Sequence, residues 1–256
     1  MTRRGRALGI RLVSLVVVIT AWELYGRSVN PILFTYPSAI AGAFRELLGT
    51  GELLRYLGQS LQVLVLSLVL SVAVGITLGV LIARFTTLEL ATDLYINALY
   101  ATPMVALVPL IVLWFGFGIP AKVVIVFLFM LFPVLINTQQ GVKSVDRDLL
   151  EVARSFCSTE RQLWGDVILP SALPFIAAGI RLAIGRGLVG MVIAEFYTSI
   201  AGLGYMIVRY ANAFETAKLF VPIVVLMAMG VLLVQGARAF ELRIAPWRHH
   251  GLGGER

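Results

Sequence analysis

Six long runs of apolar residues constrain this chain more than any other feature of its sequence. The chain has 256 residues, of which 59% are hydrophobic and only 14% charged, so a soluble fold has too little polar surface to cover the apolar runs. A helix needs about 20 apolar residues to cross a hydrocarbon layer about 30 Å thick. By that criterion, six segments are predicted to span a bilayer: residues 10–29, 59–83, 92–115, 121–140, 172–196 and 219–240. We therefore expect an all-α, polytopic membrane protein in which residues 1–256 form a single transmembrane domain.

The distribution of Lys and Arg predicts how the chain is oriented. With six spans, both ends lie on one side of the membrane. Of the 21 Lys and Arg residues, 13 fall on the side of the termini and of segment 141–170, six fall on the opposite side, and Arg181 and Arg186 lie within the fifth span. Basic residues favour the cytoplasmic side. We expect a cell (inner) membrane protein with both termini cytoplasmic, and no nucleic-acid partner, because the basic residues follow the membrane flanks.

Residues 141–170 form the longest predicted connection on the cytoplasmic side. Asp146 is placed to cap a helix with acidic residues in its first turn, which the helix dipole favours. Gly165 and Pro170 are expected to end the segment before the fifth span. Such a segment, with one apolar face, is suited to docking on a soluble partner. That face is predicted from residues at helical spacing: Leu149, Leu150, Ala153, Phe156, Leu163, Trp164 and Val167.

Part of this segment resembles the EAA loop of ABC-importer permeases. It reads Glu151-Val-Ala, three residues, Cys157, nine residues, Val167, one residue, Leu169-Pro170, where the family has Glu-Ala-Ala, Gly, Ile and Leu-Pro at the same spacing. Further stretches resemble the sulfonate, taurine and nitrate-type branch of the binding-protein-dependent permeases. They extend from about residue 34 to the C-terminus: FTYPSAI, VPLIVLWFGFG, LFPVLINTQQGV, VILPSALPFIAAGIRLAIGR and IAEFYTSIAGLGYMI.

The resemblance implies a type I importer (MetI-like) permease fold, with a coupling helix at about residues 147–164 between the fourth and fifth spans. It implies a subunit that is not an enzyme and that moves a small anionic solute, organic or inorganic, into the cytoplasm by alternating access. The implied partners are two copies of a cytoplasmic ATPase, an extracytoplasmic solute-binding protein, a second permease copy forming a homodimer, and the lipid bilayer. ATP and Mg²⁺ would bind the ATPase, because this chain has no GxxxxGK[ST] loop, and no cofactor is expected here. ATPase contacts are expected from Glu151, Ala153, Arg154, Ser155, Cys157, Leu163, Leu169 and Pro170.

Cys157 is the main departure from the family pattern, because it replaces the glycine at which the loop turns. Two backbone conformations are open at this position. If the backbone is left-handed, a cysteine costs about 1–2 kcal/mol relative to glycine. If it is right-handed, the position requires only a small side chain. We expect the second.

Ionisable side chains within the spans are candidate functional groups, because burying them in lipid is costly. At 1.5 Å per residue, Arg186 lies about 18 Å from Pro174, near the membrane midplane. Arg181 and Arg186 are separated by about 140° around a helix, so they do not share a face. Arg186 either lines the pathway and attracts an anionic solute, or it has a structural role, bonding to backbone carbonyls or to Glu195 or packing at a dimer interface.

The third predicted span carries two prolines, Pro103 and Pro109. Each removes a backbone donor and is expected to kink the helix, leaving carbonyls that must face protein or a water-filled cavity. The polar residues around the first kink are therefore candidates for the pathway. The full set of pathway candidates is Asn97, Thr102, Pro103, Arg186 and Glu195.

An ion-coupled secondary carrier that works without an ATPase is the alternative class. An inverted repeat or a pair of carboxylates within the spans would favour it, and the sequence has neither. The resemblance to importer permeases, rather than composition, separates the two classes.

Overall fold

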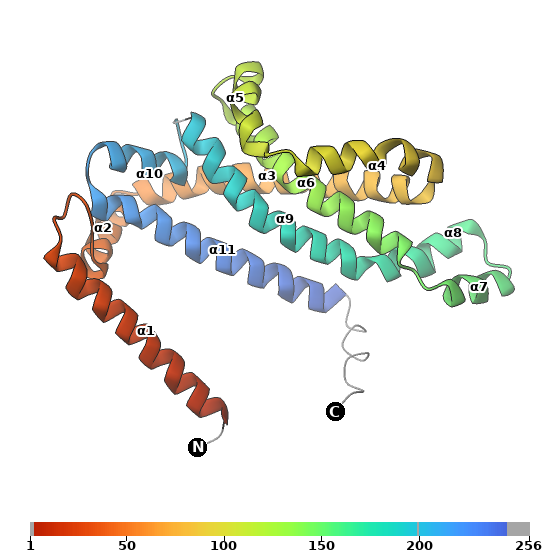
Figure 1. Cartoon of the computed structure of the whole chain (residues 1–256), viewed down its shortest axis with the longest axis horizontal. Helices are drawn as coiled ribbons and strands as arrows, with labels where there is room; N and C mark the ends of the chain where they lie inside the picture. The colour runs from red at the N-terminus through yellow and green to blue at the C-terminus, as the bar shows by residue number, and fades with distance from the viewer. Residues whose placement is uncertain (1–2, 199, 245–256) are drawn as a thin grey trace. The chain divides into compact units, whose positions relative to one another are not determined.

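A computed structural model of the chain describes residues 3–198 and 200–244, and every regular element in that part is helical (Figure 1). Eleven of these elements are α-helices and one, η1, is a short π-helix. In chain order they are α1 (Arg3–Ser28), α2 (Pro37–Gly49), α3 (Glu52–Arg84), α4 (Thr86–Ala101), α5 (Met104–Phe115), α6 (Ile119–Lys143), α7 (Arg147–Ser155), α8 (Glu160–Gln162), η1 (Leu163–Ile168), α9 (Leu169–Thr198), α10 (Leu203–Asn212) and α11 (Thr216–Ile244).

The helices form two compact units, each built from two stretches of chain. The first unit comprises Met1–Ser60 with Ser199–Met227, and the second comprises Leu61–Thr198 with Ala228–Arg256. Helices α3 and α11 are each divided between the two units: one part of the helix belongs to the first unit and the other part to the second. The 141–170 segment and the predicted pathway residues all belong to the second unit.

Each predicted span coincides with one apolar helix or one bent pair of helices. The part of the chain that is described has five helices long and apolar enough to cross a membrane, and the pair α4 and α5 makes a sixth candidate. The helices extend beyond the predicted spans. Helix α3, for example, has 33 residues, whereas the predicted span covered 59–83. The reason is that an apolar run marks only the part of a helix that lies in lipid.

The third predicted span bends at the first of its two prolines, where a kink was expected, and the bend is sharp enough to divide it into two helices. Helices α4 and α5 meet at an angle of 94°. The break falls at Thr102, which is extended (φ −66°, ψ 132°), and at Pro103, which precedes the first residue of α5. A proline disfavours the helical conformation of the residue before it and cannot donate a helical hydrogen bond. Pro109 does not break the chain and lies inside α5.

In the second unit, α3 packs closely on α6 along four small residues spaced four apart: Ser67, Ser71, Gly75 and Gly79. The hydroxyls of the two serines each donate to a backbone carbonyl of α6 at 3.1 Å. A Cβ added to Gly75 or Gly79 would lie 2.9 Å and 2.7 Å, respectively, from side-chain atoms of α6. Small residues at helical spacing let two helix backbones approach within the membrane. This line of residues therefore fixes how α3 lies against α6.

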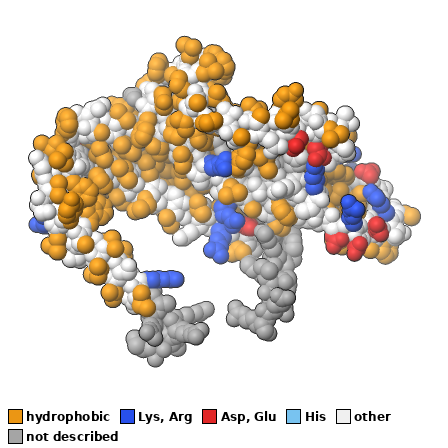
Figure 2. Space-filling model, in the orientation of Figure 1, with side chains coloured by type: hydrophobic (Ala, Val, Ile, Leu, Met, Phe, Trp, Pro, Cys, Tyr) orange, Lys and Arg blue, Asp and Glu red, His pale blue; other side chains and the backbone are white. Residues whose placement is uncertain are grey.

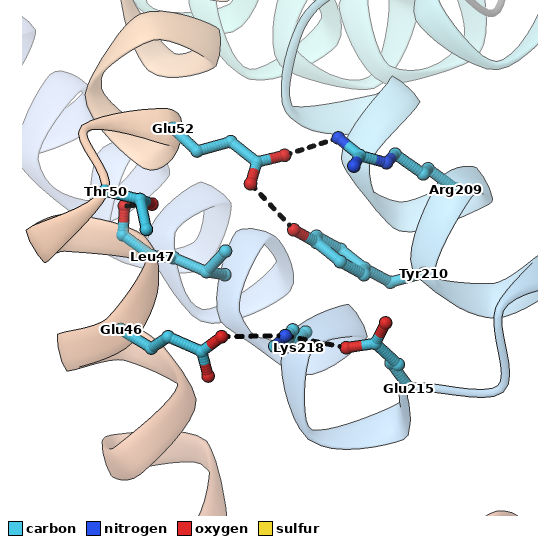
Figure 3. A network of polar contacts seen from close by, with 8 residues as sticks. All are labelled: Glu46, Leu47, Thr50, Glu52, Arg209, Tyr210, Glu215 and Lys218. Atoms are coloured by element: carbon cyan, nitrogen blue, oxygen red, sulfur yellow. Dashed lines mark hydrogen bonds and ion pairs between the residues drawn. The ribbon is translucent and has the colours of Figure 1, made fainter.

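In the first unit, a charged network joins four helices near their ends (Figure 3). Glu52 of α3 accepts hydrogen bonds from Arg209 (2.6 Å) and Tyr210 (3.0 Å) of α10. Lys218 of α11 pairs with Glu46 of α2 at 2.9 Å. Burial, together with the hydrogen bond to Glu52, raises the pKa of Tyr210 to about 12. The phenol therefore stays protonated, and stays a donor to Glu52, throughout the physiological pH range.

Candidate functional site

The 141–170 segment begins with the capped helix that the sequence predicts. The Asp146 carboxylate accepts a hydrogen bond from the backbone N–H of Asp148 at 2.9 Å, and α7 follows. Charged side chains of both signs gather over α7 and α8 (Figure 2). The predicted coupling helix at 147–164 is not one helix, because a turn at residues 156–158 separates α7 from α8.

The expectation that Gly165 and Pro170 end this segment was wrong. Helix α8, η1 and α9 form one continuous helical stretch, Glu160–Thr198, of 39 residues. Pro170 cannot donate a helical hydrogen bond. In the turn just before it, the N–H of Leu169 bonds to the carbonyl of Trp164, five residues back, instead of four. This π-helical turn lets the helix continue past the proline.

The apolar residues of the segment lie on two faces, not on the single face that was predicted. One set packs against α3, α6 and α9 in a buried cluster: Leu150, Ala153, Leu163, Trp164 and Val167. The other set lies on α7 and its end and is exposed: Leu149 (51%), Val152 (53%) and Phe156 (81%). We call this second set the exposed α7 face. The loop is thus fixed to the helices by one face and leaves the other without a partner within the residues described.

The predicted ATPase contacts differ in accessibility. Leu163 is buried in the cluster, and Ala153 and Pro170 are half-buried. The remaining predicted contacts are exposed: Glu151, Arg154, Ser155, Cys157 and Leu169. Glu151 and Arg154 are thus exposed on the same helix as the exposed α7 face, but at 100° per residue they lie on other sides of it.

Cys157 has a left-handed backbone (φ 55°), so the expectation of a right-handed backbone was wrong. The physical reason is the way in which α7 ends. The N–H of Cys157 bonds to the carbonyl of Arg154 at 2.9 Å, and the N–H of Ser158 bonds to that of Ala153 at 3.2 Å. These two bonds form a Schellman motif, which requires a left-handed residue immediately after the helix cap. Glycine is the residue that takes this conformation without strain.

Replacing Cys157 with glycine is expected to stabilise the loop. The change relieves about 1–2 kcal/mol of backbone strain, partly offset by the roughly 0.5–1 kcal/mol that glycine costs through the entropy of the unfolded chain. Ser155→Gly, two residues earlier in the right-handed part of α7, is the matched control and is expected to destabilise the loop. Hydrogen exchange of the α7 amides measures both effects. Slower exchange in Ser155→Gly than in Cys157→Gly would contradict the assignment.

The second candidate site is a cavity of about 300 Å³ at the break between α4 and α5. Arg186 of α9 is the only charged residue among the described residues that line it. Its guanidinium donates to the hydroxyl of Tyr100, near the end of α4, at 2.7 Å, and lies 4.7 Å from the centre of the Tyr100 ring. The rest of the lining comes from Thr102, Met104, Leu128, Phe129, Phe132, Gly185 and Val189.

The structure brings only some of the predicted pathway residues together. Arg186 and Thr102 line the cavity, and Pro103 lies at the break beside it. Asn97 is exposed, donates to a carbonyl of its own helix at 2.9 Å and does not line the cavity. Glu195 is 1% exposed and interacts electrostatically with Lys122 at the start of α6, a position that suits a contact between helices.

Sequence reasoning missed two partners of the intramembrane arginines. Arg181 forms an ion pair with Glu241 of α11, and Arg186 bonds to Tyr100 of α4, so the two arginines do point to different neighbours. Glu241 is an acidic residue near the end of the sixth apolar helix and is 8% exposed. A search for opposite charges at similar depth on different spans would have found the first pair. Tyr100 carries no comparable signal.

Comparison with known proteins identifies the family. The family model of the binding-protein-dependent transport system inner membrane component matches residues 75–246. A Bacillus subtilis protein named as an aliphatic sulfonates transport permease, SsuC, is 35% identical over 91% of this chain and 85% of its own. The formylaminopyrimidine transport permease ThiX of Halalkalibacterium halodurans is 32% identical over 97% of this chain and 99% of its own. The taurine transport permease TauC of Escherichia coli is 29% identical over 96% of this chain and 92% of its own.

Solved structures agree on the fold. The MetNI methionine ABC transporter in an inward-facing conformation matches with a TM-score of 0.63 at 16% identity, over 72% of this chain and 92% of that one. An amino acid ABC transporter with histidines matches with a TM-score of 0.60 at 19% identity, over 79% and 97%. The MetI-like permease fold predicted from the sequence is thereby confirmed, and the secondary carrier is not favoured. This multi-pass chain belongs to the inner-membrane permeases of binding-protein-dependent ABC transport systems.

Proposed function

We propose that this chain is the permease of an importer that moves a small organic anion into the cytoplasm by alternating access, driven by separate ATPase subunits. The observation that carries the proposal is the exposed α7 face, on a loop whose other face is anchored in the protein. The sulfonate permease among the relatives supports an anionic solute, the taurine permease supports a solute with a sulfonate group, and Arg186 is the one cation among the described residues that line the cavity. ThiX is named for a pyrimidine instead, so the relatives alone do not set the solute.

The anchoring of the loop supports a mechanical role. The buried cluster beneath α7 includes residues of α3, α6 and α9, so a displacement of α7 acts on three helices of the second unit at once. A rigid, apolar and exposed helix face is the kind of surface that docks in a groove of another protein. We infer that ATPase closure is passed to the spans through this contact, and that ATP and Mg²⁺ bind the ATPase rather than this chain.

The remaining parts of the proposal follow from the family and from the Lys and Arg count. A solute-binding protein delivers the solute from outside, two ATPase copies bind inside, and a second copy of this chain completes the pathway as a homodimer. Both termini and segment 141–170 face the cytoplasm.

Replacing Glu151 with lysine tests the proposal. Glu151 is an exposed side chain of α7, so the reversed charge is expected to weaken ATPase binding by roughly tenfold or more while the permease still folds. ATPase co-purification and solute uptake in proteoliposomes measure the effect. Glu160→Lys makes the same charge change on the same loop beyond the turn and is expected to have a smaller effect. Normal ATPase retention and normal uptake in Glu151→Lys would refute the role of α7.

A further inference from the structure

We propose that the cavity at the break between α4 and α5 is a binding site for an organic anion with a short apolar body, such as an alkanesulfonate. In this site Arg186 and Tyr100 bind the charged group, and the wall from α6 binds the apolar body. The inference rests on the proposed transport function and adds to it a site within the permease itself, with named donors.

The environment of Arg186 is the first step. The side chain is exposed on the second unit, although it belongs to an apolar helix that crosses the membrane. A guanidinium at this depth is costly in lipid, so its exposed side must face water, protein or a solute. Stacking on the Tyr100 ring at 4.7 Å and the 2.7 Å bond to its hydroxyl orient the guanidinium. Its remaining N–H groups are left for an anion, which a planar guanidinium binds in a bidentate manner.

Tyr100 supplies the second donor. Its oxygen accepts the bond from Arg186, so its hydroxyl proton is available to another acceptor, and none is found for it within residues 3–198 and 200–244. Thr102 also lines the cavity, but its hydroxyl already donates to the carbonyl of Ala98 at 2.8 Å. An anion beside Arg186 therefore receives hydrogen bonds from Arg186 and Tyr100.

The cavity wall sets the class of anion. Five apolar side chains line it, and no carboxylate is among its described lining residues. A volume of about 300 Å³ is at the small end of ligand pockets, which suits a solute of a few carbon atoms. Sulfate is strongly hydrated and would leave the apolar wall without a partner. The apolar side chains are Met104, Leu128, Phe129, Phe132 and Val189.

Direct binding to the assembled transporter tests the site. Permease and ATPase are reconstituted together in lipid nanodiscs without the binding protein, and calorimetry is performed with butane-1-sulfonate, sulfate and 1-butanol. Butane-1-sulfonate is expected to bind at least about tenfold more tightly than either of the others, because only it has both the charge and the apolar body. Arg186→Gln is expected to weaken its binding by roughly tenfold or more, and Tyr100→Phe by roughly fivefold.

A matched pair of glycine substitutions separates this site from other cavities. A Cβ at Gly185 meets no atom within 4 Å, so Gly185→Leu fills the cavity without disturbing the helix and is expected to weaken butane-1-sulfonate binding. Gly236 of α11 is equally open and lines a different cavity between α9 and α11 that has no charged residue among its described lining. Gly236→Leu is expected to leave binding unchanged.

The site is overturned if the wild-type complex does not bind butane-1-sulfonate, if Arg186→Gln binds it as tightly, or if the two leucine variants behave alike. ATP hydrolysis and ATPase retention are measured on every sample. A complex that retains and couples its ATPase but fails these binding tests disproves the site and leaves the proposed function intact. A permease that binds the sulfonate but does not retain or stimulate the ATPase disproves the proposed function and leaves the site.

Discussion

Replacing Phe156 with aspartate is expected to release the ATPase and to abolish uptake. Phe156 is the C-cap residue of α7, is 81% exposed and is the largest side chain of the exposed α7 face. Large aromatic residues at the centre of an interface commonly contribute about 2–4 kcal/mol, which corresponds to a loss of roughly 30-fold or more in affinity. A carboxylate at the same place adds the cost of burying an unpaired charge. Co-purification of the ATPase and uptake into proteoliposomes measure the loss.

Phe214→Asp is the matched control for this prediction. Phe214 is also an exposed phenylalanine (70%) just after a helix end, and it belongs to the first unit. It has a left-handed backbone (φ 57°), which aspartate accepts more readily than most side chains, so the substitution is expected to leave the fold unchanged. ATPase retention is expected to be normal in Phe214→Asp. Equal retention in the two variants, whether high or low, would show that the exposed α7 face is not the docking surface.

Gly79→Leu is expected to prevent the second unit from folding normally. A Cβ at Gly79 would lie 2.7 Å from the Cβ of Thr138 and 2.8 Å from the carbonyl oxygen of Leu135 on α6. Because one of these atoms belongs to the backbone, a rotamer change cannot relieve the clash, and α3 must move away from α6. Overpacking of this kind commonly costs about 1–3 kcal/mol and sometimes more. Lower yield of monodisperse protein in detergent and a lower midpoint of thermal unfolding are the expected readouts.

Gly58→Leu provides the comparison on the same helix. A Cβ at Gly58 meets nothing within 4 Å, so the same added side chain has space there. Its unfolding midpoint is expected to match that of the wild type. If Gly58→Leu and Gly79→Leu lower the midpoint equally, leucine in this helix is harmful for a reason other than contact with α6.

The sequence predicts the number and location of the membrane helices well because lipid demands long apolar runs. The sequence does not predict where such a helix bends sharply. Pro103 and Pro109 look equivalent in the sequence, yet the chain bends by 94° at the first and continues through the second. The difference is that Thr102, just before Pro103, is extended, whereas the backbone around Pro109 stays helical, and an apolar run records neither.

The site shows the same limit. The α7 cap at Asp146 was predictable because its partner is two residues away, but Arg186 and Tyr100 are 86 residues apart. The backbone conformation of Cys157 was predicted wrongly. A glycine at this position would have indicated a positive φ, whereas a cysteine gives no such indication. The two Schellman bonds, which require the positive angle, are visible only in the structure.

The unbroken helix Glu160–Thr198 has a consequence for how motion is transmitted. At 1.5 Å per residue, its 39 residues form a lever about 58 Å long that starts in the loop and carries Arg186 along its length. A tilt of about 5° about one end of such a lever moves the other end by about 5 Å. In the proposed alternating-access cycle, a small rocking of the loop would thus become a displacement of several ångströms at the far end of this helix.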